Sequence, residues 1–280
     1  MNPATQISFI GGGNMARAMI QGLLHRGVAA AQLRVGEPLA EQRELLRRDF
    51  GVRALADNQD AVRDATLVVL AVKPQQAIDL LSGLCPALVH GRTLLLSIAA
   101  GLRVADLAAC CPSLPIVRAM PNRAALVGAG ATALYAPEGI GAAARALAEQ
   151  VCAAAGSTVW VQRESDLDIV TALSGSGPAY FFLLAEQLAA AAVAQGLDAA
   201  TAGSLAKQTL RGAGALAAGE SSLAAEREAV TSKGGTTAAA LATLQAGGFD
   251  KLVAAAVAAA TRRSAELAAQ FGGANPGAPH

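Results

Sequence analysis

The chain has 280 residues, enough for two domains with a sizeable core, and a formal net charge of +1 with 15% charged residues and no basic run. The balanced charge argues against nucleic acid or a membrane surface as a partner. The four cysteines, Cys85, Cys110, Cys111 and Cys152, lack a C-x-x-C spacing, which favours buried free thiols over disulfides or a metal site.

The stretch from Ile7 to Ala16 has the pattern of a strand, a glycine turn and the start of a helix, and a strand this early leaves no room for a signal peptide. Gly11, Gly13 and Ala16 fill the slots of a G-x-G-x-x-A fingerprint. Gly11 permits a tight turn, Gly13 lets a pyrophosphate approach the backbone, and Ala16 lets the helix pack closely on the strand. The free N–H groups of the helix would face the phosphates. The predicted cofactor contacts of this loop are Gly11, Gly13, Asn14 and Met15.

A second strand is predicted at Gln32–Val35, ending near Glu37. An acidic residue at this position can bind the ribose hydroxyls of NAD and would repel the extra phosphate of NADP. Glu37 lies further from the glycine loop than is usual, and Arg34 and Arg43 are close enough to complicate the choice. A solvated residue that opens a helix is an equally good interpretation, so the choice between NADH and NADPH stays open.

The run Thr66–Val72 is continuously apolar, as expected of a strand covered on both faces in a parallel sheet. Lys73 and Pro74 follow it. Because ligands of open α/β sheets collect at the carboxyl ends of strands, Lys73 is a candidate ligand contact, with a solvated lysine as the alternative.

Further strands are predicted at Thr93–Ile98, Ile116–Met120, Ala131–Tyr135 and Thr158–Val161, with helices around Gln76–Leu84, Val104–Cys110 and Ala142–Ala155 between them. This alternation predicts an α/β fold with a Rossmann-like, doubly wound parallel sheet. Ser97–Gly101 and Met120–Asn122 follow strands and could line a nicotinamide pocket or simply turn the chain.

The alternation stops near Arg163, and long Ala- and Leu-rich helices are predicted at Pro178–Gln195, Ala199–Ala218, Thr236–Gln245 and Phe249–Phe271. We therefore expect a dinucleotide-binding domain at 1–163 and an all-helical domain at 164–280. Alanine-dense helices bury little apolar area each, which favours an obligate homodimer. Glu186 and Gln187 interrupt the alanine-rich run around 189–194 too soon for a membrane span, so a cytoplasmic protein is expected.

Two polar segments in this half, Ser174–Tyr180 and Thr231–Thr237, each precede or open a helix with small residues and hydroxyls. Free backbone N–H groups at a helix N-terminus form a ready anion site, and ordinary N-capping is the alternative. Two such segments beside a cofactor domain point to a small carboxylate substrate.

The chain resembles the Δ1-pyrroline-5-carboxylate reductase family over nearly its whole length. The resemblance rests on motifs at 9–15, 71–75, 117–122, 173–180 and 234–237. It implies reduction of 1-pyrroline-5-carboxylate to L-proline by NADPH or NADH, the last step of proline biosynthesis. It also implies a Rossmann domain followed by a helical dimerisation domain, an active site shared between subunits, and dimers that often assemble into decamers.

The resemblance assigns further cofactor contacts to Asn58, Ala71, Val72, Lys73, Pro74, Ala99 and Ala100. It assigns the substrate site to Glu164, Ser174, Gly175, Gly235, Thr236 and Thr237, with the hydroxyl of Thr237 as the catalytic group. Two positions depart from the family pattern. Arg123–Ala124 replace Thr-Pro after Met-Pro-Asn, and Lys233 replaces Pro before Gly-Gly-Thr-Thr, which puts fine substrate preference in doubt.

Two alternatives remain. A β-hydroxyacid dehydrogenase of similar build would place a lysine in the first long helix of the second domain, and Pro178–Gln195 has none. Imine reduction needs no histidine, and His25, His90 and His280 lie outside every motif. A non-catalytic nucleotide sensor is the other alternative, although a sensor would not need the second anion site.

Overall fold

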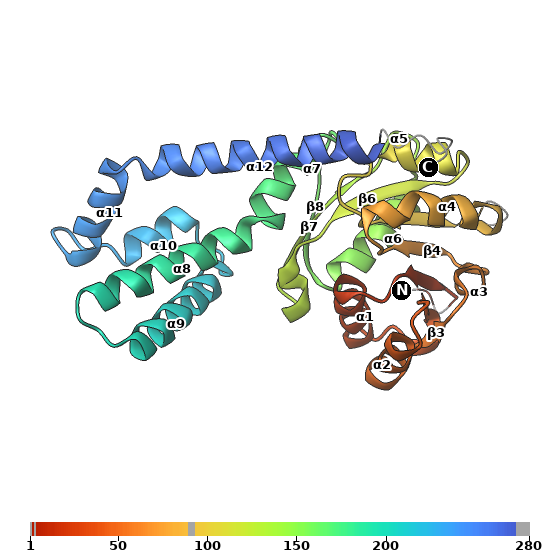
Figure 1. The fold of residues 1–280 in the computed structure, drawn as a ribbon, viewed down its shortest axis with the longest axis horizontal. Coiled ribbons are helices and arrows are strands. Elements are labelled where there is room, and N and C mark those ends of the chain that lie inside the picture. The colour runs from red at the N-terminus through yellow and green to blue at the C-terminus, as the bar shows by residue number, and fades with distance from the viewer. Residues whose placement is uncertain (1, 3, 89–92, 273–280) are drawn as a thin grey trace. The chain divides into compact units, whose positions relative to one another are not determined.

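The computed structural model describes residues 2, 4–88 and 93–272, so His90 and His280 lie outside the described residues. The chain divides into two compact units, residues 1–175 with 260–280, and residues 176–259 (Figure 1). The predicted domain boundary after residue 163 rests on the change in composition along the chain, whereas the two units are defined by their contacts, so this boundary stays a prediction.

The first unit contains one eight-stranded sheet with the order β3-β2-β1-β4-β5-β6-β7-β8. The strands are β1 (Ile7–Ile10), β2 (Leu33–Gly36), β3 (Arg53–Leu55), β4 (Leu67–Leu70), β5 (Leu94–Ser97), β6 (Ile116–Met120), β7 (Gly130–Tyr135) and β8 (Gly156–Trp160). The predicted strands are confirmed within a few residues. β3 was not predicted, because three residues carry too little periodicity to stand out.

The predicted parallel sheet is confirmed for all pairs of neighbouring strands but one, since β7 pairs antiparallel with β6. β8 pairs parallel with β7, so the last two strands run against the first six. The segment between β6 and β7 is residues 121–129, which hold the 3₁₀ helix η2 (Arg123–Val127). A crossover to a parallel strand needs about a dozen residues or more, so this short connection can only return the chain antiparallel.

Helices cover both faces of the sheet and create two cores. The helices of this unit are α1 (Asn14–His25), α2 (Ala40–Phe50), α3 (Asn58–Val62), α4 (Pro74–Leu88), α5 (Val104–Cys110), α6 (Ala142–Ala153), α7 (Asp166–Val170) and the end of α12 (Phe249–Gly272), with the short η1 (Ala30–Gln32) and η2 and the π-helical η3 (Thr171–Gly175). In β4, Leu67 and Val69 pack in one core, while Val68 and Leu70 pack in the other, because successive side chains of a strand point to opposite faces.

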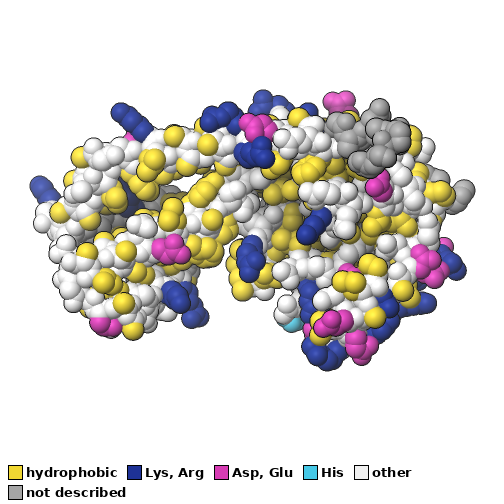
Figure 2. All heavy atoms as spheres, viewed as in Figure 1, with side chains coloured by type: hydrophobic (Ala, Val, Ile, Leu, Met, Phe, Trp, Pro, Cys, Tyr) yellow, Lys and Arg dark blue, Asp and Glu magenta, His cyan; other side chains and the backbone are white. Residues whose placement is uncertain are grey.

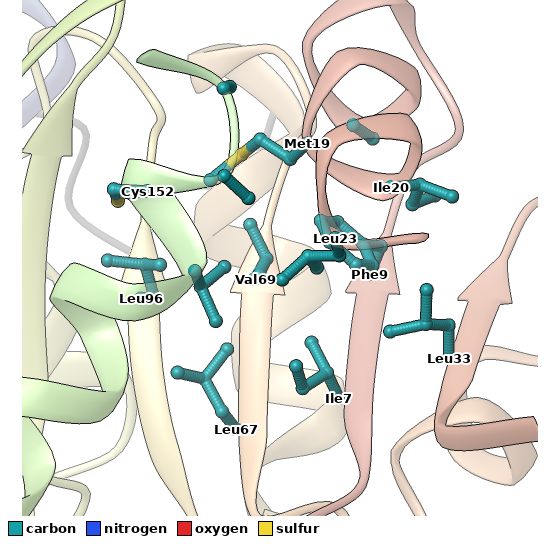
Figure 3. Close-up of a cluster of buried hydrophobic side chains, with 14 of the residues drawn as sticks. Ile7, Phe9, Met19, Ile20, Leu23, Leu33, Leu67, Val69, Leu96 and Cys152 are labelled. Atoms are coloured by element: carbon teal, nitrogen blue, oxygen red, sulfur yellow. The ribbon is translucent and has the colours of Figure 1, made fainter. Parts of the chain in front are cut away.

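The first core joins the strands β1, β2, β4 and β5 to α1, α2 and α6. Figure 3 shows its central side chains, among them Phe9, Val69 and Leu96 from the strands and Met19 and Leu23 from α1. The second core joins the other face of the sheet to α3, α4 and α5. This arrangement confirms the doubly wound α/β fold.

The cysteine prediction is wrong for one pair, because Cys85 of α4 and Cys111, the residue after α5, form a disulfide. The two residues are 26 positions apart, and only the packing of α4 beside α5 brings their Cα atoms to 5.4 Å. Cys110 and Cys152 are free, and Cys152 is buried as predicted. Among the described residues no group of His, Cys, Asp or Glu side chains is arranged to hold a metal ion.

The second unit is entirely helical. It holds α8 (Gly177–Ala194), α9 (Ala199–Ala217), α10 (Leu223–Ala229) and α11 (Thr236–Ala246), together with the first part of α12 (Phe249–Gly272). Among its residues only Gly177 and Ala202 are buried. Large apolar side chains are exposed along α8 and α9, including Phe181, Phe182, Leu183, Leu188 and Leu205, and hydrophobic side chains appear at the surface of this unit in Figure 2. This unit therefore has almost no core of its own.

By length and composition alone, the stretch Asp166–Ala194 is apolar enough to cross a membrane. The window reaches back through η3 to α7, upstream of the alanine-rich run that Glu186 and Gln187 interrupt, so the absence of a membrane span stays a prediction. A helix that packs its apolar surface against a second protein subunit has the same composition.

Candidate cofactor and substrate site

The glycine loop has the tight turn that the fingerprint predicts. Gly11 has a φ of +96°, in the region that favours glycine, and its N–H donates to Gly36 O at 2.9 Å. A Cβ atom at Gly11 would lie 2.8 Å from the carbonyl oxygen of Ala71. The loop is therefore pressed between the ends of β2 and β4, where a larger residue would not fit.

The start of α1 is open to a ligand. Gly13 is the N-cap of the helix and is exposed, and no side chain caps the first turn. A Cβ atom at Gly13 would meet nothing within 4 Å. Asn14 is exposed and Met15 half-buried, whereas Ala16 is fully buried against the sheet. These features fit a dinucleotide, because a pyrophosphate could approach the backbone N–H groups at the positive end of the helix.

Glu37 lies directly against this loop. Its Oε2 accepts a hydrogen bond from Gly12 N–H at 3.0 Å, and its Oε1 accepts one from Leu39 N–H at 3.0 Å. The residue is only 9% exposed. The interpretation of Glu37 as a solvated residue is therefore wrong.

Asn58, the first residue of α3, presents an unsatisfied acceptor at the same edge. Its Oδ1 is buried and has no hydrogen-bond partner among the described residues. A Cβ atom at the neighbouring Gly36 would lie 2.1 Å from this oxygen. A buried acceptor without a donor costs about 1–3 kcal/mol, so a donor supplied by a ligand, such as a hydroxyl group, would fit here.

The remaining predicted cofactor contacts follow β4 and β5. Ala71 N–H donates to Ile10 O at 2.9 Å, and Val72 Cγ1 would lie 2.9 Å from a Cβ at Gly11. Lys73 is exposed and Pro74 opens α4. After β5, Ala99 is buried and Ala100 exposed. The parallel strands β1, β2, β4 and β5 thus bring the predicted contacts to their common carboxyl edge.

Glu164 of the predicted substrate set is already paired within the first unit. Its Oε1 accepts hydrogen bonds from Arg118 Nη1 and from the backbone N–H of Val104, both at 2.7 Å. Arg118 is largely buried in β6. Glu164 therefore ties the start of α5 to β6, a tertiary link that the motifs did not indicate.

Ser174 and Gly175 lie in the π-helical turn η3, and π-helical turns are frequent at functional sites. Asn122 braces this turn, since its Nδ2 donates to Ser174 O at 3.0 Å and its Oδ1 accepts from Ala131 N–H at 3.0 Å. A Cβ atom at Gly175 would lie 3.1 Å from Met120 Cε. Met120 and Asn122 therefore support the turn η3, and a role for Met120–Asn122 in lining a nicotinamide pocket stays a prediction. Arg118 is a further candidate at this site that no sequence signal singled out, although it belongs to the motif at 117–122.

The other half of the predicted substrate set lies in the second unit. Gly234 has a φ of +71°, and the extended Gly235 is the N-cap of α11, with no side-chain cap. Thr236 is exposed and Thr237 half-buried in the first turn. The exposed Lys233 precedes them. The segment thus offers free N–H groups and hydroxyls, as predicted.

Comparisons with known proteins identify the family. The model for pyrroline-5-carboxylate reductase dimerisation matches residues 164–267, and a model for NADP oxidoreductase, coenzyme F420-dependent, matches residues 6–101. The pyrroline-5-carboxylate reductase of Pseudomonas aeruginosa is 46% identical over 269 residues, which cover 95% of this chain and 98% of that protein. The chain belongs to the pyrroline-5-carboxylate reductase family.

Solved structures agree with this family. A pyrroline-5-carboxylate reductase from Coxiella burnetii aligns with a TM-score of 0.91 at 38% identity, covering 94% of this chain and 98% of that one. The Plasmodium falciparum pyrroline carboxylate reductase, solved with NADP bound, has a TM-score of 0.78 at 27% identity and the same coverage. Membership of this family makes the chain an NAD(P)-dependent oxidoreductase of the pyrroline-5-carboxylate reductase type, and not a β-hydroxyacid dehydrogenase or a non-catalytic sensor. It also makes the exposed helices of the second unit part of a dimerisation domain.

Proposed function

We propose that this protein reduces 1-pyrroline-5-carboxylate to L-proline with NADPH or NADH, the last step of proline biosynthesis. One observation carries the proposal. A chain 46% identical to a pyrroline-5-carboxylate reductase keeps an open glycine loop at the sheet edge and an uncapped Gly-Gly-Thr-Thr helix start. The nicotinamide supplies a hydride to the imine carbon, and the ring nitrogen takes a proton.

The dinucleotide would be held at the carboxyl edge of the sheet. We assign its phosphates to the backbone of the glycine loop and the start of α1, because those N–H groups lack a side-chain cap. The unsatisfied Oδ1 of Asn58 would accept a hydrogen bond from the cofactor. The proposed contacts are Gly11, Gly13, Asn14, Met15, Glu37, Asn58, Ala71, Val72, Lys73, Pro74, Ala99 and Ala100.

The substrate carboxylate would bind the N–H groups at the start of α11, since a helix N-terminus favours an anion. The hydroxyl of Thr237 would then orient the imine nitrogen and help to supply its proton. The proposed substrate contacts are Ser174, Gly175, Gly235, Thr236 and Thr237, with Glu164 as a positioning residue. For Glu164 we propose an indirect contribution, because its carboxylate already binds Arg118 and Val104.

The active unit is proposed to be a cytoplasmic homodimer that can assemble further into a decamer. The support is the match of residues 164–267 to a dimerisation domain, together with the nearly coreless second unit. An active site shared between two subunits would explain why the apolar helices carry the polar segment before α11.

The test is substrate-dependent oxidation of NADH or NADPH by the purified protein. We expect turnover with pyrroline-5-carboxylate and formation of proline, and no comparable rate with an open-chain β-keto acid. A comparable rate with the keto acid would support the β-hydroxyacid dehydrogenase alternative. Tight dinucleotide binding without turnover of either compound would support the sensor.

A further inference from the structure

We propose that Glu37 makes NADH the preferred cofactor of this protein and discriminates against NADPH. The inference rests on the proposed function and extends it to the choice of dinucleotide, which sequence reasoning left open.

The carboxylate of Glu37 is fixed in position at the edge where the adenosine ribose of a dinucleotide binds in this kind of fold. Each of its oxygens accepts one backbone hydrogen bond, from Gly12 and from Leu39, both at 3.0 Å. The backbone of Glu37 is held as well, because its own N–H donates to Leu55 O at 2.9 Å. A side chain held at both ends and 9% exposed cannot swing away from an incoming phosphate.

The same carboxylate keeps free capacity for a ribose. An ionised carboxylate has about four acceptor positions, and the two backbone donors occupy two of them. Two ribose hydroxyls are donors that can fill the others. A 2′-phosphate offers acceptor oxygens and negative charge, so it would find no donor in Glu37 and would be repelled by it.

Neither neighbouring arginine forms a hydrogen bond or an ion pair with this carboxylate. Arg34 Nη1 donates to the carbonyl of Arg63 at 2.7 Å. Arg43 Nη1 donates to the carbonyls of Glu37 and Pro38 at 2.9 and 2.7 Å, and not to the carboxylate. No ion pair within the described part of the chain involves Glu37. Arg43 is therefore a positioning residue that holds the backbone of the Glu37–Pro38 turn.

The experiment measures equilibrium binding of NADH and NADPH to the full-length protein without substrate, by nicotinamide fluorescence or calorimetry. We expect the unaltered protein to bind NADH at least about tenfold more tightly than NADPH, with the difference shrinking as salt is added. In Glu37→Gln the charge is lost, and the ratio of the dissociation constant of NADPH to that of NADH should fall about tenfold or more. Glu37→Asp, which keeps the charge, should retain a preference for NADH.

The matched control is Glu41→Gln, which removes the same charge from an exposed residue in the first turn of α2. For this variant, the ratio of the two dissociation constants should stay within about twofold of the ratio for the unaltered protein. Equal or tighter binding of NADPH by the unaltered protein would overturn the proposal, even if Glu37→Gln does not fold. An unchanged ratio in folded Glu37→Gln would overturn it too, and loss of NADPH binding in Arg43→Gln would assign the 2′-phosphate to Arg43 instead. Failure to bind either dinucleotide would contradict the proposed function itself.

Discussion

The position of Thr237 in α11 decides between two interpretations of its hydroxyl, a helix cap or a catalytic group. As a polar residue at a helix start, it could have served merely as a cap. The N-cap of α11 is instead Gly235, which has no side chain, and Thr237 is the second residue of the helix. Its hydroxyl therefore does not cap the helix, which strengthens the proposed role in orienting the imine.

Replacement of Thr237 by alanine should lower kcat/KM for pyrroline-5-carboxylate by two to three decades, because loss of a transition-state donor typically costs about 2–4 kcal/mol. The dissociation constant of the dinucleotide should barely change, since the proposed cofactor contacts lie in the other unit. The melting temperature should also change little. Steady-state rates, dinucleotide binding and thermal unfolding on one preparation test these expectations.

The control for this substitution is Thr243→Ala, on the same helix, where the hydroxyl donates only to Ala239 O. It should leave kcat/KM near the value of the unaltered protein. Near-normal turnover in Thr237→Ala would show that the catalytic assignment is wrong.

At the scale of elements, the disulfide between Cys85 and Cys111 connects α4 to the end of α5. Both helices pack on the second core, and Glu164 holds the start of α5 from the other end. The link therefore restrains two helices that follow strands of the proposed cofactor site.

Cys85→Ser should lower the free energy of unfolding by roughly 3 kcal/mol in oxidising buffer, because a cross-link over 26 residues restricts the unfolded chain. With a reductant present, the variant and the unaltered protein should differ much less. Cys110→Ser, at the free neighbouring thiol, is the control and should behave like the unaltered protein. Urea unfolding of all three proteins in both buffers gives these free energies, and equal stabilities of Cys85→Ser and the unaltered protein in oxidising buffer would contradict the disulfide.

A thiol count checks the same pairing. Burial, aided by the charge of Glu149, raises the pKa of the Cys152 thiol to about 12. The thiol stays protonated and unreactive at neutral pH, so native protein should react with a thiol reagent at Cys110 alone. Three reactive thiols in the native protein would contradict the disulfide.

The folded state favours the protonated form of Cys152. The contribution of this thiol to the free energy of unfolding should therefore decrease as the pH rises from the ordinary pKa of a cysteine toward 12.

At the scale of the whole molecule, the second unit needs a partner. Its helices α8 and α9 form an open groove of about 510 Å³ whose lining includes Phe182, Ala189 and Leu210. Phe182 is 54% exposed in the single chain. Exposed apolar side chains gathered on two neighbouring helices indicate an interaction surface, in agreement with the dimerisation domain matched at 164–267.

Phe182→Asp should weaken self-association, because it places a charge on apolar surface that a second copy would bury. Light scattering should give at least twice the chain mass of 28.0 kDa for the unaltered protein and a smaller mass for the variant at low concentration. Turnover should fall with the mass, whereas dinucleotide binding should persist. Val127→Asp, which adds the same charge at an 81% exposed residue of the first unit, is the control and should change neither mass nor turnover. A monomeric unaltered protein would refute the homodimer.

The sequence by itself determined the elements whose signal is local. The turn at Gly11, the strand Ile116–Met120 and the helix Val104–Cys110 lie where they were predicted, since φ preference and the spacing of apolar residues act over a few positions. The two-part organisation also follows from the sequence, because strand patterns end near Arg163. The proposed cofactor contacts could be predicted as a set, since parallel strands bring their carboxyl ends to one edge.

Only the tertiary structure decided the features that join distant positions. The burial of Glu37 depends on a loop 25 residues away in the chain, and the bonds of Asn122 and Glu164 span 52 and 46 residues. The Cys85–Cys111 pairing depends on how α4 packs beside α5. Such contacts depend on packing between elements, so no local pattern encodes them. The reversal of β7 is the exception, because the short connection after β6 could have predicted it.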